Sequence, residues 1–192
     1  MTHSPARAGQ LYPASAVSLS MDTSQASSAI PRPHLDVPFV PTPQEVIDAM
    51  LDLTGVGRSD MLVDLGCGDG RIVVGAARRG ARATGIDLNP LRVAEARENA
   101  RQAGVEARVT IHEGDLYEAD IAPATVVTLY LLPTVNLRLR ARLWQQLDVG
   151  TRVVSHAFDM GPDWPAERMI DVNERTIYFW TISEVQKRAG KA

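Results

Sequence analysis

The stretch Asp64-Leu65-Gly66-Cys67-Gly68-Asp69-Gly70-Arg71 decides the fold of this 192-residue chain. The apolar run Met61-Leu62-Val63 leads directly into it, and the apolar helical pattern Ile72-Val73-Val74-Gly75-Ala76-Ala77 follows. This order predicts a strand, a glycine turn and a helix. Because glycine has no Cβ, three glycines at alternate positions allow a sharp turn and a close approach of the backbone to a ligand. The stretch therefore predicts a ligand-binding loop at the carboxyl end of a strand.

A second acidic position lies at the expected distance from this turn. Ala83-Thr84-Gly85-Ile86-Asp87 has the pattern of a short apolar strand that ends in a carboxylate, 17 residues after Gly70. Nucleotide-binding α/β folds place the acid that accepts the ribose hydroxyls at such a strand end. Asp87 is therefore predicted to hold the ribose of an adenosine-type cofactor. The alternative is an Asp that only caps a helix or a turn.

The rest of the chain alternates between strand and helix patterns. The run at 125–132 is almost wholly apolar, as in a strand that is buried on both faces of a parallel sheet, and 151–156 is a further strand. The segment 175–182 has the β-branched and aromatic content of a last, antiparallel strand, with which 168–172 can pair. The pattern predicts an α/β, doubly wound, Rossmann-like sheet of six or seven strands, mostly parallel, with ligands at the strand carboxyl ends.

Composition divides the chain into three parts. Residues 1–35 are rich in Ser, Ala and Pro without a sustained period, which predicts a disordered leader. Residues 36–185 form the predicted catalytic domain, and 186–192 form a polar tail. We expect a cytoplasmic protein, with a cleaved export signal in the leader as the alternative. No stretch approaches the length of a membrane span.

Charge and cysteine usage exclude several classes of site. The net charge of −3 gives no general electrostatic basis for binding nucleic acid. The single cysteine, Cys67, lies within the glycine turn, so an internal disulfide, a redox pair and a zinc cluster are excluded, and no metal site is predicted. The oligomeric state stays open.

An extended arm, Val37-Pro38-Phe39-Val40-Pro41-Thr42-Pro43, precedes the first predicted helix. Its prolines favour an extended backbone. Thr42 is predicted to be the N-cap of the helix, Pro43 its first residue, and Glu45 the partner of Thr42 in a capping box. Because the arm comes shortly before the first strand of the sheet, it can fold over the mouth of the ligand site.

The D-L-G-x-G-x-G pattern of residues 64–70 resembles the first motif of the class I S-adenosylmethionine (SAM) methyltransferases, and Val109-Thr110-Ile111-His112-Glu113-Gly114-Asp115-Leu116 resembles their G-D segment. The resemblance implies SAM as the cofactor. It also implies a cofactor loop made of Gly66, Gly68 and Gly70, with Asp64 near the methionine amino group. By the same resemblance Asp87 holds the ribose, and Asp115 and Leu116 meet the adenine.

The extended arm at residues 37–43, taken together with the sequence D-L-G-C-G-D-G-R-I at residues 64–72, resembles a smaller group within this family. This combination resembles a small lysine methyltransferase group that includes the mitochondrial ATP-synthase c-subunit enzyme and archaeal relatives. The resemblance implies methyl transfer to a lysine side chain of a protein. Alternatives are methylation of a small molecule or of RNA, although Leu131-Leu132-Pro133 stands where nucleic-acid amino methyltransferases have Asn-Pro-Pro-Tyr. A SAM-binding interaction module without catalysis is the alternative from a different class.

Three residues near predicted strand ends are candidates for the catalytic rim. Tyr130 can orient an amine through its hydroxyl or its ring, or it can be a buried structural tyrosine. Asn136 can line the rim or cap the helix that follows. His156 can accept a proton or serve as a hydrogen-bonded scaffold histidine. A lysine acceptor must lose a proton before it attacks, because its unperturbed pKa is about 10.4.

Overall fold

The structure of the protein, a computed structural model, describes residues 40–191, so the predicted leader at 1–35 lies outside the described residues. In chain order the elements are α1 (Gln44–Thr54), β1 (Met61–Leu65), α2 (Arg71–Arg78), β2 (Arg82–Asp87), α3 (Pro90–Gln102), the 3₁₀ turn η1 (Glu106–Arg108), β3 (Val109–Glu113), β4 (Val126–Leu129), α4 (Pro133–Gln146), β5 (Arg152–His156), β6 (Arg168–Val172), β7 (Arg175–Thr181) and α5 (Glu184–Ala189). The alternation of strands and helices confirms the predicted fold class.

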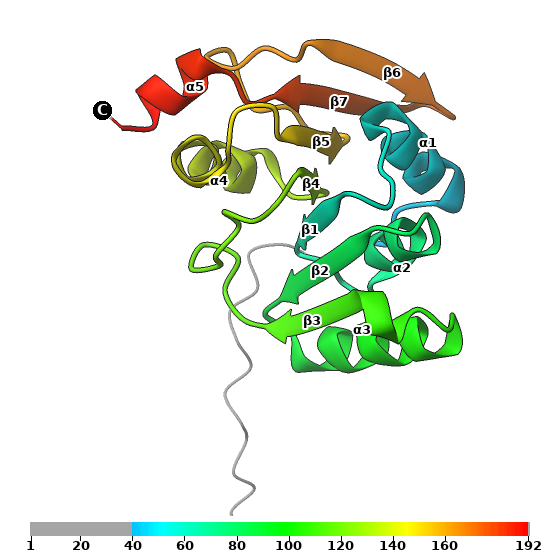
Figure 1. Ribbon diagram of the computed structural model, residues 1–192. Helices are drawn as coiled ribbons and strands as arrows, with labels where there is room; N and C mark the ends of the chain where they lie inside the picture. The colour runs from blue at the N-terminus through cyan, green and yellow to red at the C-terminus, as the bar shows by residue number, and fades with distance from the viewer. Residues whose placement is uncertain (1–39, 192) are drawn as a thin grey trace, which may run out of the picture. The chain divides into compact units, whose positions relative to one another are not determined.

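One sheet of seven strands runs through the protein in the order β3-β2-β1-β4-β5-β7-β6 (Figure 1). The five strands from β3 to β5 are parallel, whereas β7 is antiparallel to both β5 and β6. The chain leaves β1 toward β2 on one side and later returns to place β4 on the other side. This reversal of strand order next to β1 is the position where open α/β sheets bind their ligands.

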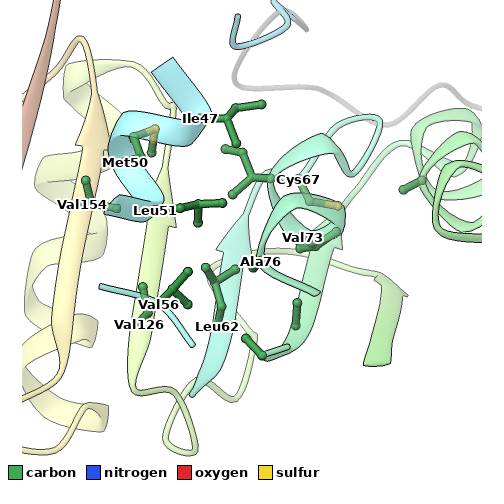
Figure 2. Close-up of a cluster of buried hydrophobic side chains, with 14 of the residues drawn as sticks. Ile47, Met50, Leu51, Val56, Leu62, Cys67, Val73, Ala76, Val126 and Val154 are labelled. Atoms are coloured by element: carbon green, nitrogen blue, oxygen red, sulfur yellow. The ribbon is translucent and has the colours of Figure 1, made fainter. Parts of the chain in front are cut away.

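Helices cover both faces of the sheet. In Figure 1, α1, α2 and α3 lie on one face, and α4 and α5 lie on the other. Ile47 and Leu51 of α1 pack with Leu62 of β1 and Val73 of α2 in the first cluster of buried apolar side chains (Figure 2). Leu139 of α4 belongs to the second cluster, on the opposite face. Burial of these two clusters fixes the sheet between its helices and makes the strand ends a rigid platform.

Several boundaries differ from those predicted. The strand β4 ends at Leu129, three residues before the end of the predicted run, because the chain turns there toward α4. The connection from β3 to β4, residues 114–125, is a loop and contains no helix. The helix α5 spans the boundary at residue 185, and its last turn brings Gly190 against the backbone of Trp144. Residues 184–189 are helical, and the division of the chain at residue 185 into a domain and a polar tail stays a prediction.

The start of α1 also differs from the prediction. Its N-cap is Pro43, the helix begins at Gln44, and no side chain caps it. Thr42 is thus not an N-cap and takes no part in a capping box. Its hydroxyl instead faces His156, 3.4 Å from the ring nitrogen Nδ1. A tertiary contact between residues far apart in the sequence has replaced the local one.

Packing at Gly85 of β2 supplies a test of the fold. A Cβ at this position would lie 2.7 Å from the sulfur of Cys67 and 2.9 Å from Cδ1 of Ile111. We expect Gly85→Ala to lower the free energy of unfolding by about 1 to 3 kcal/mol, because added volume in a packed core forces neighbours to move. Gly57→Ala is the control, since a Cβ there meets no atom within 4 Å. Equal denaturant midpoints for the two variants would contradict the packing described.

Candidate cofactor and acceptor site

A pocket opens at the carboxyl ends of β1, β2 and β4, where the strand order reverses. Five stretches line it: the end of the arm, the glycine loop after β1, the end of β2 with the start of α3, the loop after β3, and the residues after β4. Among the predicted cofactor residues, the following line the pocket: Asp64, Gly66, Asp87, Asp115 and Leu116. The structure therefore brings together side chains from three predicted motifs.

Asp87 holds the glycine loop in place as well as facing the pocket. Its Oδ2 accepts a hydrogen bond from the backbone N–H of Gly68 at 2.8 Å, and its Oδ1 accepts one from the N–H of Asn89 at 2.9 Å. The carbonyl of Ile86 accepts two more bonds from the loop, from Gly66 at 2.9 Å and from Cys67 at 3.0 Å. Each carboxylate oxygen can accept more than one hydrogen bond, so Asp87 keeps acceptor capacity for the hydroxyls of a ribose.

The three glycines of the loop have different roles. All three have left-handed backbone angles, with φ of 77° at Gly66, 53° at Gly68 and 78° at Gly70. Only Gly66 lines the pocket. A Cβ at Gly70 would lie 2.8 Å from the Cβ of Ala96 in α3, so this glycine permits close helix packing. Gly68 and Gly70 thus shape the loop from behind rather than contacting the pocket.

Asp64 is a buried carboxylate with few compensating contacts. Its side chain is 2% exposed, and its Oδ1 accepts one hydrogen bond from the Thr128 hydroxyl at 2.7 Å. The pKa of Asp64 is raised to about 7, chiefly by burial; the hydrogen bond from Thr128 lowers it, and the nearby charges of Asp87 and Asp69 raise it. A positive ligand group beside this carboxylate would stabilise its charged form.

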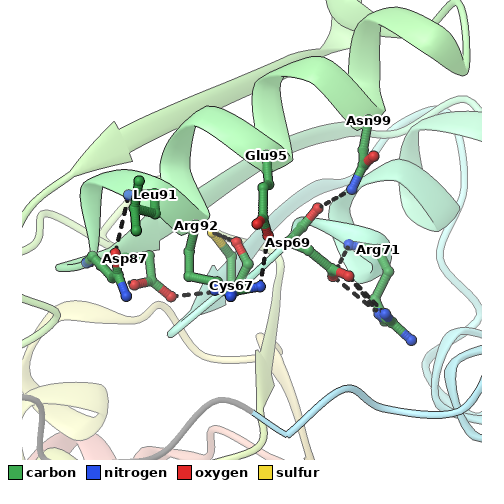
Figure 3. A network of polar contacts seen from close by, with 10 residues as sticks. Cys67, Asp69, Arg71, Asp87, Leu91, Arg92, Glu95 and Asn99 are labelled. Carbon is green, nitrogen blue, oxygen red and sulfur yellow. Dashed lines mark hydrogen bonds and ion pairs between the residues drawn. The ribbon is translucent and has the colours of Figure 1, made fainter.

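Arg71 is a pocket residue whose importance the sequence analysis missed. Its guanidinium bonds both carboxylate oxygens of Asp69, with Nε 3.0 Å from Oδ1 and Nη2 2.6 Å from Oδ2 (Figure 3). Its Nη1 donates to the carbonyl of Thr42 at 3.0 Å. Asn99 of α3 donates to the carbonyl of Asp69 at 2.9 Å. The signal was present, because an arginine two residues after an aspartate in a turn is placed for such an ion pair.

The loop after β3 brings a second missed residue to the pocket. Asp115 accepts a hydrogen bond from the N–H of Tyr117 at 2.8 Å, which closes a tight turn. Tyr117 is 7% exposed and lines the pocket beside Leu116. The guanidinium of Arg138 in α4 lies 3.7 Å from the centre of the Tyr117 ring, a cation–π contact across the two elements. An aromatic residue two positions after the predicted Asp115 was the available signal.

The three catalytic candidates do not form one group. Tyr130 lines the pocket, and its ring centre lies 3.9 Å from that of His156 and 6.5 Å from that of Phe158. His156 is 1% exposed and does not line the pocket. Its burial, helped by the charge of Arg175, lowers its pKa to about 4, so the ring is neutral at pH 7 and a poor proton acceptor.

Asn136 lies outside the pocket and does not cap the helix. It is fully buried within α4, and its Nδ2 donates to the carbonyls of Phe158 at 3.2 Å and Asp159 at 3.3 Å. Because α4 begins at Pro133, Asn136 lies one turn inside the helix. Its amide attaches the loop after β5 to α4. The geometry therefore separates Asn136 from the pocket that Tyr130 lines.

Comparisons with known proteins agree with this geometry. The family model of the ANTKMT methyltransferase domain matches residues 64–168. The chain belongs to this family. A protein-lysine N-methyltransferase of Saccharolobus islandicus is 42% identical over 158 residues, which cover 79% of this chain and 96% of that protein. The adenine nucleotide translocase lysine N-methyltransferase of Mus musculus is 39% identical over 77% of this chain, but the match spans only 63% of the mouse protein.

A solved structure gives the same fold with a ligand. The crystal structure described as an RNA methyltransferase from Salinibacter ruber, in complex with S-adenosyl-L-homocysteine, superposes with a TM-score of 0.74 and is 56% identical. The match covers 76% of this chain and 95% of that one. The present protein is a SAM-dependent methyltransferase of the same Rossmann-like fold.

The charges of the pocket fit SAM. Four carboxylates line it, those of Asp64, Asp69, Asp87 and Asp115, and one of them, Asp69, is paired with Arg71. SAM carries a sulfonium and an ammonium together with ribose hydroxyls, which match an excess of carboxylates. We expect Asp87 to hold the ribose and Asp64 to face the ammonium. When bound, SAM supplies an electrophilic methyl group, and the chain contributes its binding and orientation.

The described residues offer neither a metal site nor a membrane span. Within residues 40–191, no group of three or more His, Cys, Asp and Glu side chains is arranged to hold a metal ion. In the same part of the chain, no helix combines the length and the apolar character needed to cross a membrane.

The role of Asp87 can be measured directly by calorimetry. We expect Asp87→Ala to weaken SAM binding by about 1 to 3 kcal/mol, because it removes charge-assisted hydrogen bonds and leaves ligand hydroxyls without an acceptor. The control is Asp171→Ala in β6, which removes a carboxylate that accepts a bond from Thr176 at 2.7 Å, outside the pocket. An unchanged SAM affinity in folded Asp87→Ala would remove this residue from the site.

Asp64 makes the stability of the ligand-free protein depend on pH. Its pKa in the folded protein is about 7, above the ordinary value of 3.8, so the folded state holds the proton more tightly. The carboxyl group therefore destabilises the fold increasingly as pH rises from about 4 to 7. We expect Asp64→Asn to remove this loss and to raise the free energy of unfolding at pH 8, by at most about 4 kcal/mol. The same variant should bind SAM more weakly.

Asp60, near the start of β1, is the matched contrast. Burial alone would raise its pKa, but hydrogen bonds from Thr125 and Gly57 and the guanidinium of Arg152 hold the pKa below its usual range. Asp60→Asn should therefore lower stability at pH 8, the opposite sign. Urea unfolding at pH 4 to 8 measures both variants, and the same sign of change in the two would contradict the assignment.

Proposed function

We propose that this protein transfers the methyl group of SAM to the side-chain nitrogen of a lysine in a protein. The observation that carries the proposal is the similarity to the Saccharolobus protein, which covers 96% of that protein-lysine N-methyltransferase. Because the match spans nearly the whole of the Saccharolobus protein, the matched region of that protein must also contain the part that binds its acceptor. The pocket supports the proposal, because its carboxylates match the positive groups and hydroxyls of SAM and because Tyr130 lines it.

Tyr130 is the residue that we propose to orient the acceptor. Within residues 40–191 no hydrogen-bond partner is found for its hydroxyl, so the hydroxyl is free to accept a bond from an amine. The Tyr130 ring lines the pocket beside Leu131 and stacks on the Phe158 ring, so it offers an apolar surface next to which an ammonium loses its proton more easily than in water. His156 supports the Tyr130 ring, and its low pKa makes it unsuited to be the base.

Alignment of the amine is then the main contribution of the protein. A lysine nitrogen attacks only as the neutral amine, and orientation of the two reactants can account for about 7 to 11 kcal/mol of barrier lowering. The ring of Tyr130 excludes water from the amine, and the proton of the ammonium leaves to solvent before the amine is enclosed. No dedicated base is required in this scheme.

RNA is the second candidate acceptor, favoured by one observation. The Salinibacter protein is 56% identical and is described as an RNA methyltransferase. Against this reading stand the net charge of −3 and the carboxylates of the pocket, since RNA binding calls for clustered positive charge. A small-molecule acceptor stays as a third outcome of the test. We also propose that this protein acts on its protein acceptor in the cytoplasm.

Transfer from labelled SAM to a cell extract distinguishes these acceptors. We expect acid-stable label in the protein fraction, which amino-acid analysis recovers as methyl-lysine. Label that ribonuclease removes indicates RNA, and label in the low-molecular-weight fraction indicates a metabolite. Binding of SAM without transfer to any fraction indicates an interaction module.

Chemical blocking of lysines is the matched control. Reductive alkylation or acylation of the extract before the reaction removes the free amines, so label in protein should fall to background. If blocked and unblocked extracts accept label equally, the lysine proposal fails, although SAM binding and methyl transfer remain. Tyr130→Phe removes only the hydroxyl, and we expect a lower rate at unchanged SAM affinity.

A further inference from the structure

We propose that Thr42 is a positioning residue that couples the cofactor pocket to Tyr130 on the acceptor side. The proposal rests on the proposed function only in placing the acceptor at Tyr130. It depends on two sets of contacts of Thr42, one through its backbone and one through its side chain. The side-chain contact is buried, since Thr42 is 4% exposed, and the backbone contact is partly buried.

The backbone contact ties the arm to the glycine loop. The carbonyl of Thr42 accepts a hydrogen bond from Arg71 at 3.0 Å, and Arg71 is itself held by two bonds to Asp69 in the loop. Thr42 itself lines the pocket, with Val40 and Pro41 before it and with Asp69 and Arg71 of the loop. A ligand that orders the glycine loop therefore also orders the end of the arm.

The side-chain contact leads to the acceptor side. The Thr42 hydroxyl lies 3.4 Å from Nδ1 of His156, and the other ring nitrogen, Nε2, is buried without a hydrogen-bond partner. The His156 ring packs on the Tyr130 ring at 3.9 Å between centres. The hydroxyl of Thr42 is thus the only polar side-chain contact of His156 within residues 40–191, and it sets the orientation of the ring that supports Tyr130.

The local sequence supports the same conclusion. Thr42 and Glu45 have the spacing of a capping box, yet the first turn of α1 has no side-chain cap. A side chain at the N-cap stabilises a helix by about 1 kcal/mol. The helix α1 lacks this stabilisation, and the Thr42 hydroxyl contacts His156 instead. Departures of this kind from local rules are typical of functional positions.

Two variants of Thr42 test the coupling. Thr42→Val keeps the shape and removes the hydroxyl, and Thr42→Ser keeps the hydroxyl. We expect Thr42→Val to change the SAM dissociation constant by less than about threefold and to lower kcat about tenfold, which corresponds to about 1.4 kcal/mol in the transition state. Thr42→Ser should recover kcat to within about twofold of the wild type. If Thr42→Val does not fold, Thr42→Ala replaces it.

The control is Thr54→Val at the other end of α1. Thr54 is 3% exposed, and its hydroxyl bonds the carbonyls of Met50 and Leu51, so its loss affects the helix but not His156. We expect kcat close to that of the wild type. The coupling is wrong if Thr42→Val retains full kcat, if Thr42→Ser loses as much as Thr42→Val, or if Thr54→Val loses as much as either.

The readout does not depend on the class of acceptor. Formation of S-adenosyl-L-homocysteine is followed with whichever fraction the wild-type enzyme labels. If that fraction is RNA or a metabolite, the lysine proposal fails while the comparison of the Thr42 variants stands. If lysine is labelled and the variants all resemble the wild type, the coupling fails while the lysine proposal stands.

Discussion

The attachment of the glycine loop to the end of β2 is the contact on which the whole site depends. Three consecutive N–H groups after β1, those of Gly66, Cys67 and Gly68, donate to the carbonyl of Ile86 and the carboxylate of Asp87. Within the loop the N–H of Gly70 donates to the carbonyl of Cys67 at 2.9 Å, so this turn and the bonds to β2 together set the path of its three left-handed residues. The same carboxylate that shapes the loop also lines the pocket, where we expect it to hold the ligand. Binding and folding therefore share one side chain, and its mutation affects both.

The electrostatics of the pocket follow from this sharing. Carboxylates gather at the strand ends, where each disfavours the charged form of its neighbours. Asp64 is 2% exposed and accepts a bond from the Thr128 hydroxyl, so burial is the largest cause of its raised pKa and the charges of Asp87 and Asp69 add to it. The site is thus less stable by itself than a neutral core would be, a common cost of binding sites. Ligand binding relieves the repulsion and stabilises the fold.

Much of the fold was predictable, because its signals are local or periodic. The glycine turn, the strand-end position of Asp87 and the apolar strands follow from spacing in the sequence, and parallel strand ends necessarily meet at one edge of the sheet. The loop between β3 and β4 was not predictable in the same way. It buries Ile121 and Ala124 in the second cluster without forming a helix, so its place depends on tertiary packing.

The errors at Thr42 and Asn136 share one physical cause. Both residues match a rule for helix caps, and both use their polar groups on partners that are distant in the sequence. The hydroxyl of Thr42 meets His156, 114 residues away, and the amide of Asn136 bonds carbonyls more than 20 residues away. Capping contributes about 1 kcal/mol, whereas an unsatisfied buried polar group costs about 1 to 3 kcal/mol. Tertiary partners can therefore displace the local motif, and the sequence contains no signal of where they lie.

The acceptor is decided by a different part of the protein from the cofactor. One protein similar to this chain is named a protein-lysine N-methyltransferase, and another is described as an RNA methyltransferase. Similarity to the two relatives therefore does not by itself identify the acceptor. We propose that selection comes from the side of the pocket that Tyr130 lines. The neighbouring His156 has a pKa lowered to about 4 and is therefore a weak base, so in this proposal the Tyr130 ring contributes desolvation instead. An amine that loses its proton to solvent before it is enclosed suits such a surface. Of the positive charges that line the pocket, Arg71 is paired with Asp69, which does not favour a phosphate-bearing chain.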